Sequence, residues 1–202
     1  MSLSFYEAGD ADKPLVVLLH GGGTLHRFWQ PQLEAFSERY HVIAPDLIYD
    51  DWTHFTVPQL AQDVAALVCA QGKPAHLVGL SLGGAVALQL AVTAPEWVRS
   101  LTVTGAQYAP GKGYGGTLMG RVIKGVFRLI PERLLLRTLL RALVTIYPAL
   151  SEEARAEVYR VGKAGFVAAI DALTAIDLSA QLPKIRRPTL VMVGALDQPG
   201  LR

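Results

Sequence analysis

Two patterns of apolar and polar positions alternate along this chain. Short apolar runs recur, and most are followed by a turn and then by a segment with helical periodicity. Unbroken apolar runs are typical of strands that are buried on both faces of a parallel sheet. The pattern predicts strands near residues 3–6, 15–19, 41–45, 77–78, 99–104 and 188–194. Strands that alternate with helices predict an α/β fold, with a mostly parallel sheet and helices on both of its faces.

Helices are expected over residues 29–39 and 56–71. The second begins with Thr56 and Gln59 at capping-box spacing. Cys69, the only cysteine, falls in this second helix and is expected to be a small buried hydrophobe. A single cysteine excludes an intramolecular disulfide and a metal site built from cysteines.

One long segment separates the last two predicted strands. Residues 107–182 are expected to form a helical cap or lid, inserted between a core of residues 1–106 and a final core strand and acid loop of residues 183–202. Pro131 should divide the insertion, because proline breaks a helix interior, and Ser151 should cap a further helix. Four leucines of the insertion are expected to line an acyl pocket: Leu134, Leu135, Leu139 and Leu143.

The insertion is also basic. Arg133, Arg137 and Arg141 are four residues apart and share one helix face. A membrane-surface helix is one interpretation, and a solvated face on an ordinary cap is the simpler one. The net charge of the whole chain is only +2, which argues against nucleic acid as a partner. The first residues show no signal-peptide pattern, so a cytoplasmic protein is expected.

The most informative motif joins an apolar run to a helical run. Gly79-Leu80-Ser81-Leu82-Gly83 has the form G-x-S-x-G. A sharp strand-to-helix turn holds such a serine in a strained conformation and exposes its hydroxyl, and glycines on both sides avoid collisions. The free N–H of Leu82, at the start of the helix, could then bind an oxyanion.

Two other interpretations of this region were considered. A glycine-rich turn occurs in many α/β proteins. Residues 74–95 also contain no Asp, Glu, Lys or Arg and are long enough to span a membrane. The glycines, Ser81 and His76 argue against a membrane span.

Two further motifs complete an ordered set. His20-Gly21-Gly22-Gly23 follows an early buried run, and Asp197 follows the last one. With G-x-S-x-G between them, the chain resembles the α/β-hydrolase fold over nearly its whole length. It looks closest to esterase and lipase-like members that carry a helical cap after the sixth strand.

This resemblance implies a chemistry. Ser81 would be the nucleophile, and the oxyanion hole would combine the N–H of Leu82 with that of Gly22 or Gly23. Asp197, after the seventh strand, would orient the base. His20, Gly21, Gly79 and Gly83 would shape the two turns. The substrate would be a small ester or acyl compound, and neither cofactor nor metal would be needed.

The sequence departs from the family pattern at two places. The loop after Asp46 lacks the usual Arg-Gly. The family base is a histidine after an eighth strand, whereas all five histidines here precede Ser81. Little turnover is therefore expected of residues 1–202 alone, unless His26 or His54 substitutes as the base. An exposed sheet edge that supports homo-oligomers is also expected.

Two functions remain open from the sequence. The first is a serine hydrolase that cleaves carboxylic esters, or related acyl or C–C bonds, through an acyl-enzyme on Ser81. The second is a non-catalytic α/β-hydrolase-fold protein that acts as a binding module.

Overall fold

Six strands form one sheet in the order β1-β3-β2-β4-β5-β6, within the residues that the computed structural model describes (3–109, 125–148 and 150–194). Strand β1 is antiparallel to β3, and every other neighbouring pair is parallel. The strands are β1 (Phe5–Ala8), β2 (Leu15–Leu19), β3 (His41–Pro45), β4 (Ala75–Leu80), β5 (Val98–Thr104) and β6 (Thr189–Met192). The predicted mostly parallel α/β sheet is confirmed.

Burial follows the apolar runs. All residues of β2 and β3 are buried, as expected for central strands that are covered on both faces. Strand β1 begins at Phe5 rather than at Leu3, and three of its four residues are exposed. Strand β6 is shorter than predicted.

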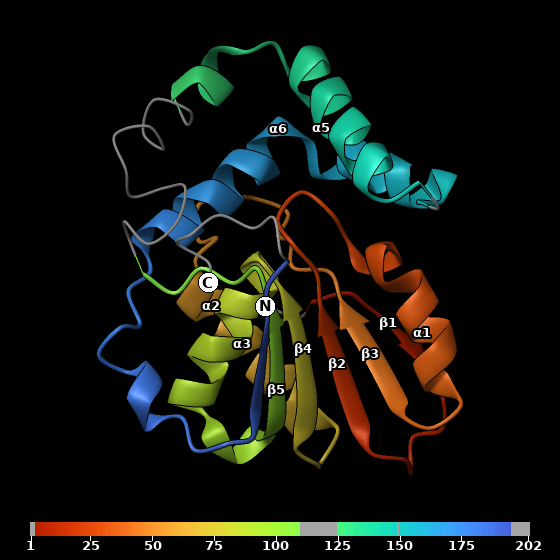
Figure 1. Cartoon of the computed structure of the whole chain (residues 1–202), viewed down its shortest axis with the longest axis vertical. Coiled ribbons are helices and arrows are strands. Elements are labelled where there is room, and N and C mark those ends of the chain that lie inside the picture. The colour runs from red at the N-terminus through yellow and green to blue at the C-terminus, as the bar shows by residue number, and fades with distance from the viewer. Residues whose placement is uncertain (1–2, 110–124, 149, 195–202) are drawn as a thin grey trace.

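Helices cover both faces of the sheet (Figure 1). Helix α1 (Gln30–Ser37) packs on one face through Leu33, and α2 (Val57–Ala70) and α3 (Leu82–Thr93) pack on the other. The first helical segment begins earlier than predicted, as a 3₁₀ turn at His26–Trp29. Helix α3 lies deepest, with residues 82–91 all buried.

Two expectations for α2 need qualification. The Thr56 side chain accepts the Gln59 N–H, as predicted, but the Gln59 amide donates to Asp63 at 3.2 Å instead of reaching back to Thr56. The prediction for Cys69 was wrong, because this side chain is exposed. The buried face of α2 includes Val64 and Val68, and Cys69 is rotated away from it.

Two long helices follow β5 and form what we call the α5–α6 layer. Helices α5 (Glu132–Ile146) and α6 (Glu152–Ala175) lie beyond the carboxyl ends of the parallel strands (Figure 1). The layer follows β5, the fifth strand among the described residues. Residues 110–124 of the predicted cap lie outside the described part.

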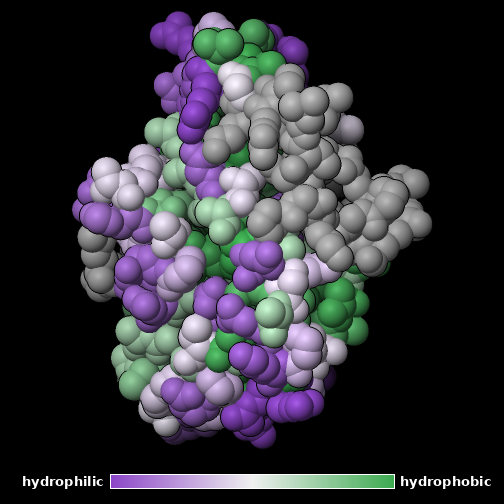
Figure 2. All heavy atoms as spheres, turned by 90° about the vertical axis from the view of Figure 1, so that its left-hand side faces the viewer, coloured by the Kyte–Doolittle hydropathy of each residue, from purple (hydrophilic) through white to green (hydrophobic). Residues whose placement is uncertain are grey.

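Local signals set the helix ends in this layer. Helix α5 begins directly after Pro131, and the Ser151 hydroxyl caps α6 by accepting the Ala154 N–H at 3.2 Å. Gly162 interrupts α6 with φ 66° and ψ −177°, which the sequence pattern did not predict. Hydrophilic and hydrophobic residues adjoin at the upper end of the molecule, the end that carries this layer (Figure 2).

Strand β6 ends the sheet. It pairs with β5, and no described strand pairs with its other edge. Leu190 and Val191 are 55% and 65% exposed, so the expected apolar edge is confirmed, whereas self-association through it stays a prediction. Nowhere in the described ranges is a helix both long enough and apolar enough to cross a membrane.

Candidate functional site

The strand-to-helix turn around Ser81 is strained. Ser81 lies between β4 and α3 with φ 52° and ψ −109°, and no other described residue except glycine has a positive φ. Its N–H donates to the Thr104 carbonyl at 2.9 Å. A Cβ on Gly79 would lie 2.5 Å from the Gly83 carbonyl oxygen, and one on Gly83 would lie 2.2 Å from the Leu19 carbonyl oxygen. Only glycine fits either position, as the G-x-S-x-G motif predicted.

The glycine loop after β2 lies beside this turn. A Cβ on Gly21 would be 3.7 Å from the Ser81 Cβ, and one on Gly22 would be 4.0 Å from the Leu82 Cβ. The N–H of Leu82 makes no hydrogen bond to the described part of the chain, and it opens α3, where the first N–H groups have no partner within the helix. The structure therefore brings together the predicted nucleophile and both halves of the predicted oxyanion hole.

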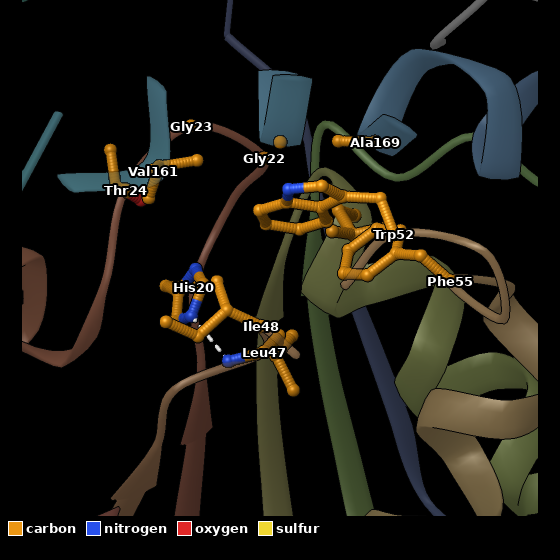
Figure 3. A pocket seen from close by; sticks show the side chains of 12 residues that line it. His20, Gly22, Gly23, Thr24, Leu47, Ile48, Trp52, Phe55, Val161 and Ala169 are labelled. Carbon is orange, nitrogen blue, oxygen red and sulfur yellow. Dashed lines mark hydrogen bonds between the residues drawn. The ribbon is translucent and has the colours of Figure 1, made fainter. Parts of the chain in front are cut away.

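His20 organises the glycine loop. Its Nε2 accepts the Leu47 N–H at 2.8 Å (Figure 3), so Nδ1 carries the proton and donates to the Gly21 carbonyl at 2.8 Å. Burial lowers the pKa of the His20 imidazole to about 4, against smaller raising effects of the Gly21 hydrogen bond and of Asp46. The backbone carbonyl of His20 accepts the Gly83 N–H at 3.1 Å. His20 is thus neutral and fully engaged, which agrees with the predicted structural role.

A small pocket opens between the glycine loop and α6. About 180 Å³ of space there is not filled by atoms, including open solvent at the mouth of the pocket. Leu82, the residue after Ser81, belongs to the lining of this pocket, whereas Ser81 itself does not. The lining residues are His20, Gly22, Gly23, Thr24, Leu47, Ile48, Trp52, Phe55, Leu82, Val161, Gly165 and Ala169 (Figure 3).

The helix that lines this pocket is α6, not α5. None of the four leucines expected in the lining is there, and Leu134 is 56% exposed instead. Two residues of α6 approach the glycine loop closely. A Cβ on Gly22 would lie only 2.7 Å from the Ala169 Cβ, and one on Gly23 would lie 3.1 Å from the Phe166 ring.

Aromatic side chains from the loop after β3 occupy part of the same space. The Trp52 and Phe55 rings meet edge to face with centroids 5.1 Å apart. A Cβ on Gly165 would lie 2.5 Å from Trp52 Cη2, so the indole packs directly on α6. The sequence pattern marks this loop as a departure from the family but does not assign Trp52 and Phe55 to the site. The position of the loop could have indicated their role, because a loop after a parallel strand lies at the carboxyl edge of the sheet, where ligands of α/β folds bind.

A buried charged cluster connects the loop after β3 to the 3₁₀ turn. The Asp46 carboxylate is buried and accepts hydrogen bonds from both the backbone N–H and Nδ1 of His26, each at 2.9 Å. It also accepts the Ser4 hydroxyl at 3.3 Å. Asp46 therefore joins the N-terminal segment, the 3₁₀ turn and the loop after β3.

Glu157 of α6 joins the same cluster. Its Oε1 lies 3.5 Å from Arg27 Nε and 3.9 Å from His26 Nε2. Burial is the main cause that raises the pKa of the Glu157 carboxyl; nearby Asp46 raises it further, and His26 and Arg27 oppose the shift. This cluster links α6 to the 3₁₀ turn, and it engages His26, one of the two candidate substitute bases.

No histidine occupies the position of a catalytic base. Within the described residues no imidazole hydrogen-bonds to Ser81 Oγ. The remaining histidines are engaged elsewhere or exposed: His41 bonds Glu7, His76 bonds Ser100, and His54 lies in an exposed loop. Asp197 falls outside the described ranges, so its role stays a prediction. The part of the chain that is described holds no group of His, Cys, Asp or Glu side chains suited to a metal ion.

Comparison with known proteins agrees with this geometry. Residues 16–201 match the model of the "Alpha/beta hydrolase family". A Variovorax paradoxus protein named "Putative carbamate hydrolase RutD" is 32% identical over 95% of this chain and 77% of its own. The pimeloyl-[acyl-carrier protein] methyl ester esterase of Aeromonas hydrophila is 28% identical over 98% of this chain and 82% of its own. The crystal structure of a Pseudomonas aeruginosa hydrolase superimposes with a TM-score of 0.80 at 28% identity, covering 96% of this chain and 76% of the other.

Proposed function

Because the chain belongs to the alpha/beta hydrolase family, we propose that it is a serine hydrolase that cleaves carboxylic esters or related acyl compounds. Ser81 is the proposed nucleophile and forms an acyl-enzyme. The observation that carries the proposal is the backbone of Ser81, whose φ of 52° is retained at a cost of order 1–3 kcal/mol. A turn without a chemical purpose would relieve that strain by placing glycine there.

The proposed oxyanion hole uses backbone groups alone. The Leu82 N–H begins α3, where unpaired donors and the helix dipole favour negative charge. Gly22 lies beside Leu82, and its N–H is the proposed second donor, with Gly23 as the alternative. Losing one donor of this kind typically costs about 10²–10³-fold in kcat.

The pocket favours a short acyl group. Its free space is small, its walls are mostly apolar, and Trp52 fills part of it. Esters with two to four acyl carbons are the proposed substrates, and Trp52→Ala is expected to shift the preference toward longer chains. Carbamate and methyl ester relatives suggest neighbouring chemistries of the same acyl type.

The second candidate function is a non-catalytic binding module. The observation that favours it is that four of the five histidines hydrogen-bond to groups other than Ser81, and that the fifth, His54, lies in an exposed loop. A serine hydroxyl without a base is a poor nucleophile, since a positioned base contributes about 10²–10⁴-fold.

Rescue with an external base separates the two functions. The 202-residue protein and its Ser81→Ala variant are assayed on p-nitrophenyl acetate and butyrate, with and without added imidazole. A serine hydrolase that lacks its base should show low turnover, and imidazole should raise it in the wild type well above the background given by Ser81→Ala. Equal rates in the two proteins at every imidazole concentration would support the binding module.

A further inference from the structure

The outward face of α5 carries three arginines in a row. Arg133, Arg137 and Arg141 are all exposed and four residues apart, so successive side chains are about 6 Å apart along the helix. Like charges at this spacing destabilise a helix. None of the three forms an ion pair with an acid among the described residues. The repulsion between these arginines therefore destabilises α5, and no contact within the described residues compensates for it.

Nearby acids are already engaged with other groups. Glu132 is the only acid in α5, and its Oε1 accepts the Lys163 N–H of α6 at 3.1 Å. Asp171 of α6 accepts a hydrogen bond from Arg128 at 3.0 Å. Among the described residues these two acids therefore pair with groups other than Arg133, Arg137 and Arg141.

Leucines are exposed beside these arginines. Leu129 is 86% exposed and Leu134 is 56% exposed, whereas Leu135 and Leu136 are buried. Helix α5 is therefore held in the layer by its buried leucines and exposes Leu134 next to Arg133, while Leu129 lies in the short helical segment just before α5. Green and purple residues meet at the corresponding end of the molecule (Figure 2).

We propose that this arginine–leucine surface, made of Arg133, Leu134, Arg137 and Arg141 of α5 together with Leu129 just before the helix, binds the surface of an anionic phospholipid bilayer. Helix α5 would lie parallel to the membrane, with the guanidinium groups on lipid phosphates and the two leucines at the boundary of the acyl chains. Charge complementarity selects anionic lipid. The leucines favour a bilayer over nucleic acid, whose phosphates require only cations.

Vesicle sedimentation of the full chain tests this interaction without an activity assay. Vesicles of phosphatidylcholine alone are compared with vesicles that contain phosphatidylglycerol. The variants are Arg133→Gln/Arg137→Gln/Arg141→Gln and Leu129→Ser/Leu134→Ser. The matched control is Arg39→Gln/Arg99→Gln/Arg186→Gln, which removes the same charge from exposed arginines next to the amino ends of strands, at the opposite end of the molecule. Circular dichroism verifies that each variant is folded.

The wild type and the matched control should bind the anionic vesicles and not the neutral ones. The α5 triple variant should bind on the order of a hundredfold more weakly, given the attraction of each arginine to an anionic surface. The leucine variant should also bind more weakly to vesicles, while its binding to heparin is unchanged. The proposal would be overturned if the wild type did not bind anionic vesicles, or if the two triple arginine variants lost the same amount of binding. It would also be overturned if the leucine variant bound vesicles as well as the wild type does.

Discussion

The imidazole of His20 accepts the backbone N–H of Leu47 at 2.8 Å and thereby joins the glycine loop to the loop after β3. Both loops line the pocket, so one neutral side chain sets the distance between two of its walls. The bond exists only while Nε2 is unprotonated, which burial enforces by lowering the pKa of His20 to about 4.

This relationship predicts acid sensitivity that is specific to His20. The folded-state pKa lies below the ordinary value of 6.5, so the unfolded chain binds a proton first as the pH falls. The contribution of His20 to the free energy of unfolding is therefore fully present above about pH 6.5, and it is lost as the pH falls toward about 4. Between about pH 7 and pH 5 the loss from His20 should be about 2 kcal/mol. Urea unfolding of the wild type and of His20→Asn measures it.

The variant should be less stable than the wild type near neutral pH, by about 1–3 kcal/mol, because the Leu47 N–H loses its partner. The difference between the two proteins should shrink at about pH 5. His54→Asn, in an exposed loop, is the control and should leave the pH profile unchanged. Wild-type and His20→Asn profiles that stay parallel over this range would contradict the role of the imidazole.

Ser81→Gly should stabilise the fold. Glycine adopts a positive φ without strain, so removing the Cβ from this position should raise the free energy of unfolding by about 1 kcal/mol. Ser81→Ala is the matched control, because it removes the hydroxyl but keeps the strained Cβ. Thermal unfolding should place Ser81→Gly above both the wild type and Ser81→Ala. If Ser81→Gly and Ser81→Ala unfolded at the same temperature, the backbone at position 81 would not be strained by its Cβ.

Features that depend on a few neighbouring residues could be predicted from the sequence. The buried strands follow from unbroken apolar runs, and the glycines around Ser81 follow from the space available in one turn. The pocket could not be predicted in the same way, because Trp52 meets Gly165 across more than a hundred residues of chain. Helical periodicity gave no sign of the break at Gly162, which Glu132 stabilises by accepting the next N–H.

The free edge of β6 predicts self-association. Leu190, Val191 and Met192 are half exposed or more, on a strand whose outer edge pairs with no other strand in the described part of the chain. Light scattering should show a mass that rises with the concentration of the 202-residue protein. Val191→Lys should reduce that rise, because a charged residue blocks strand addition at an edge. The same substitution at exposed Tyr159 of α6 is the control, and an equal effect at both positions would argue against the edge.

The contact between Gly22 and Ala169 provides the sharpest test of how α6 closes the site. A Cβ on Gly22 would lie 2.7 Å from the Ala169 Cβ, closer than two methyl groups can approach. Gly22→Ala should therefore push α6 away from the glycine loop and lower the free energy of unfolding by about 1–3 kcal/mol. Ala169→Gly alone should also be destabilising, by roughly 1 kcal/mol, because glycine is unfavourable within a helix.

The double variant Gly22→Ala/Ala169→Gly should be more stable than the sum of the two single effects predicts, because the methyl group moves from one side of the contact to the other. A coupling of about 0.5–3 kcal/mol is typical of residues in contact, and urea unfolding of the four proteins measures it. Ala172→Gly, one turn further along the same helix and also buried, replaces Ala169→Gly in the control cycle and should show no coupling with Gly22→Ala. Strict additivity in the Ala169 cycle would mean that α6 does not contact the glycine loop in solution.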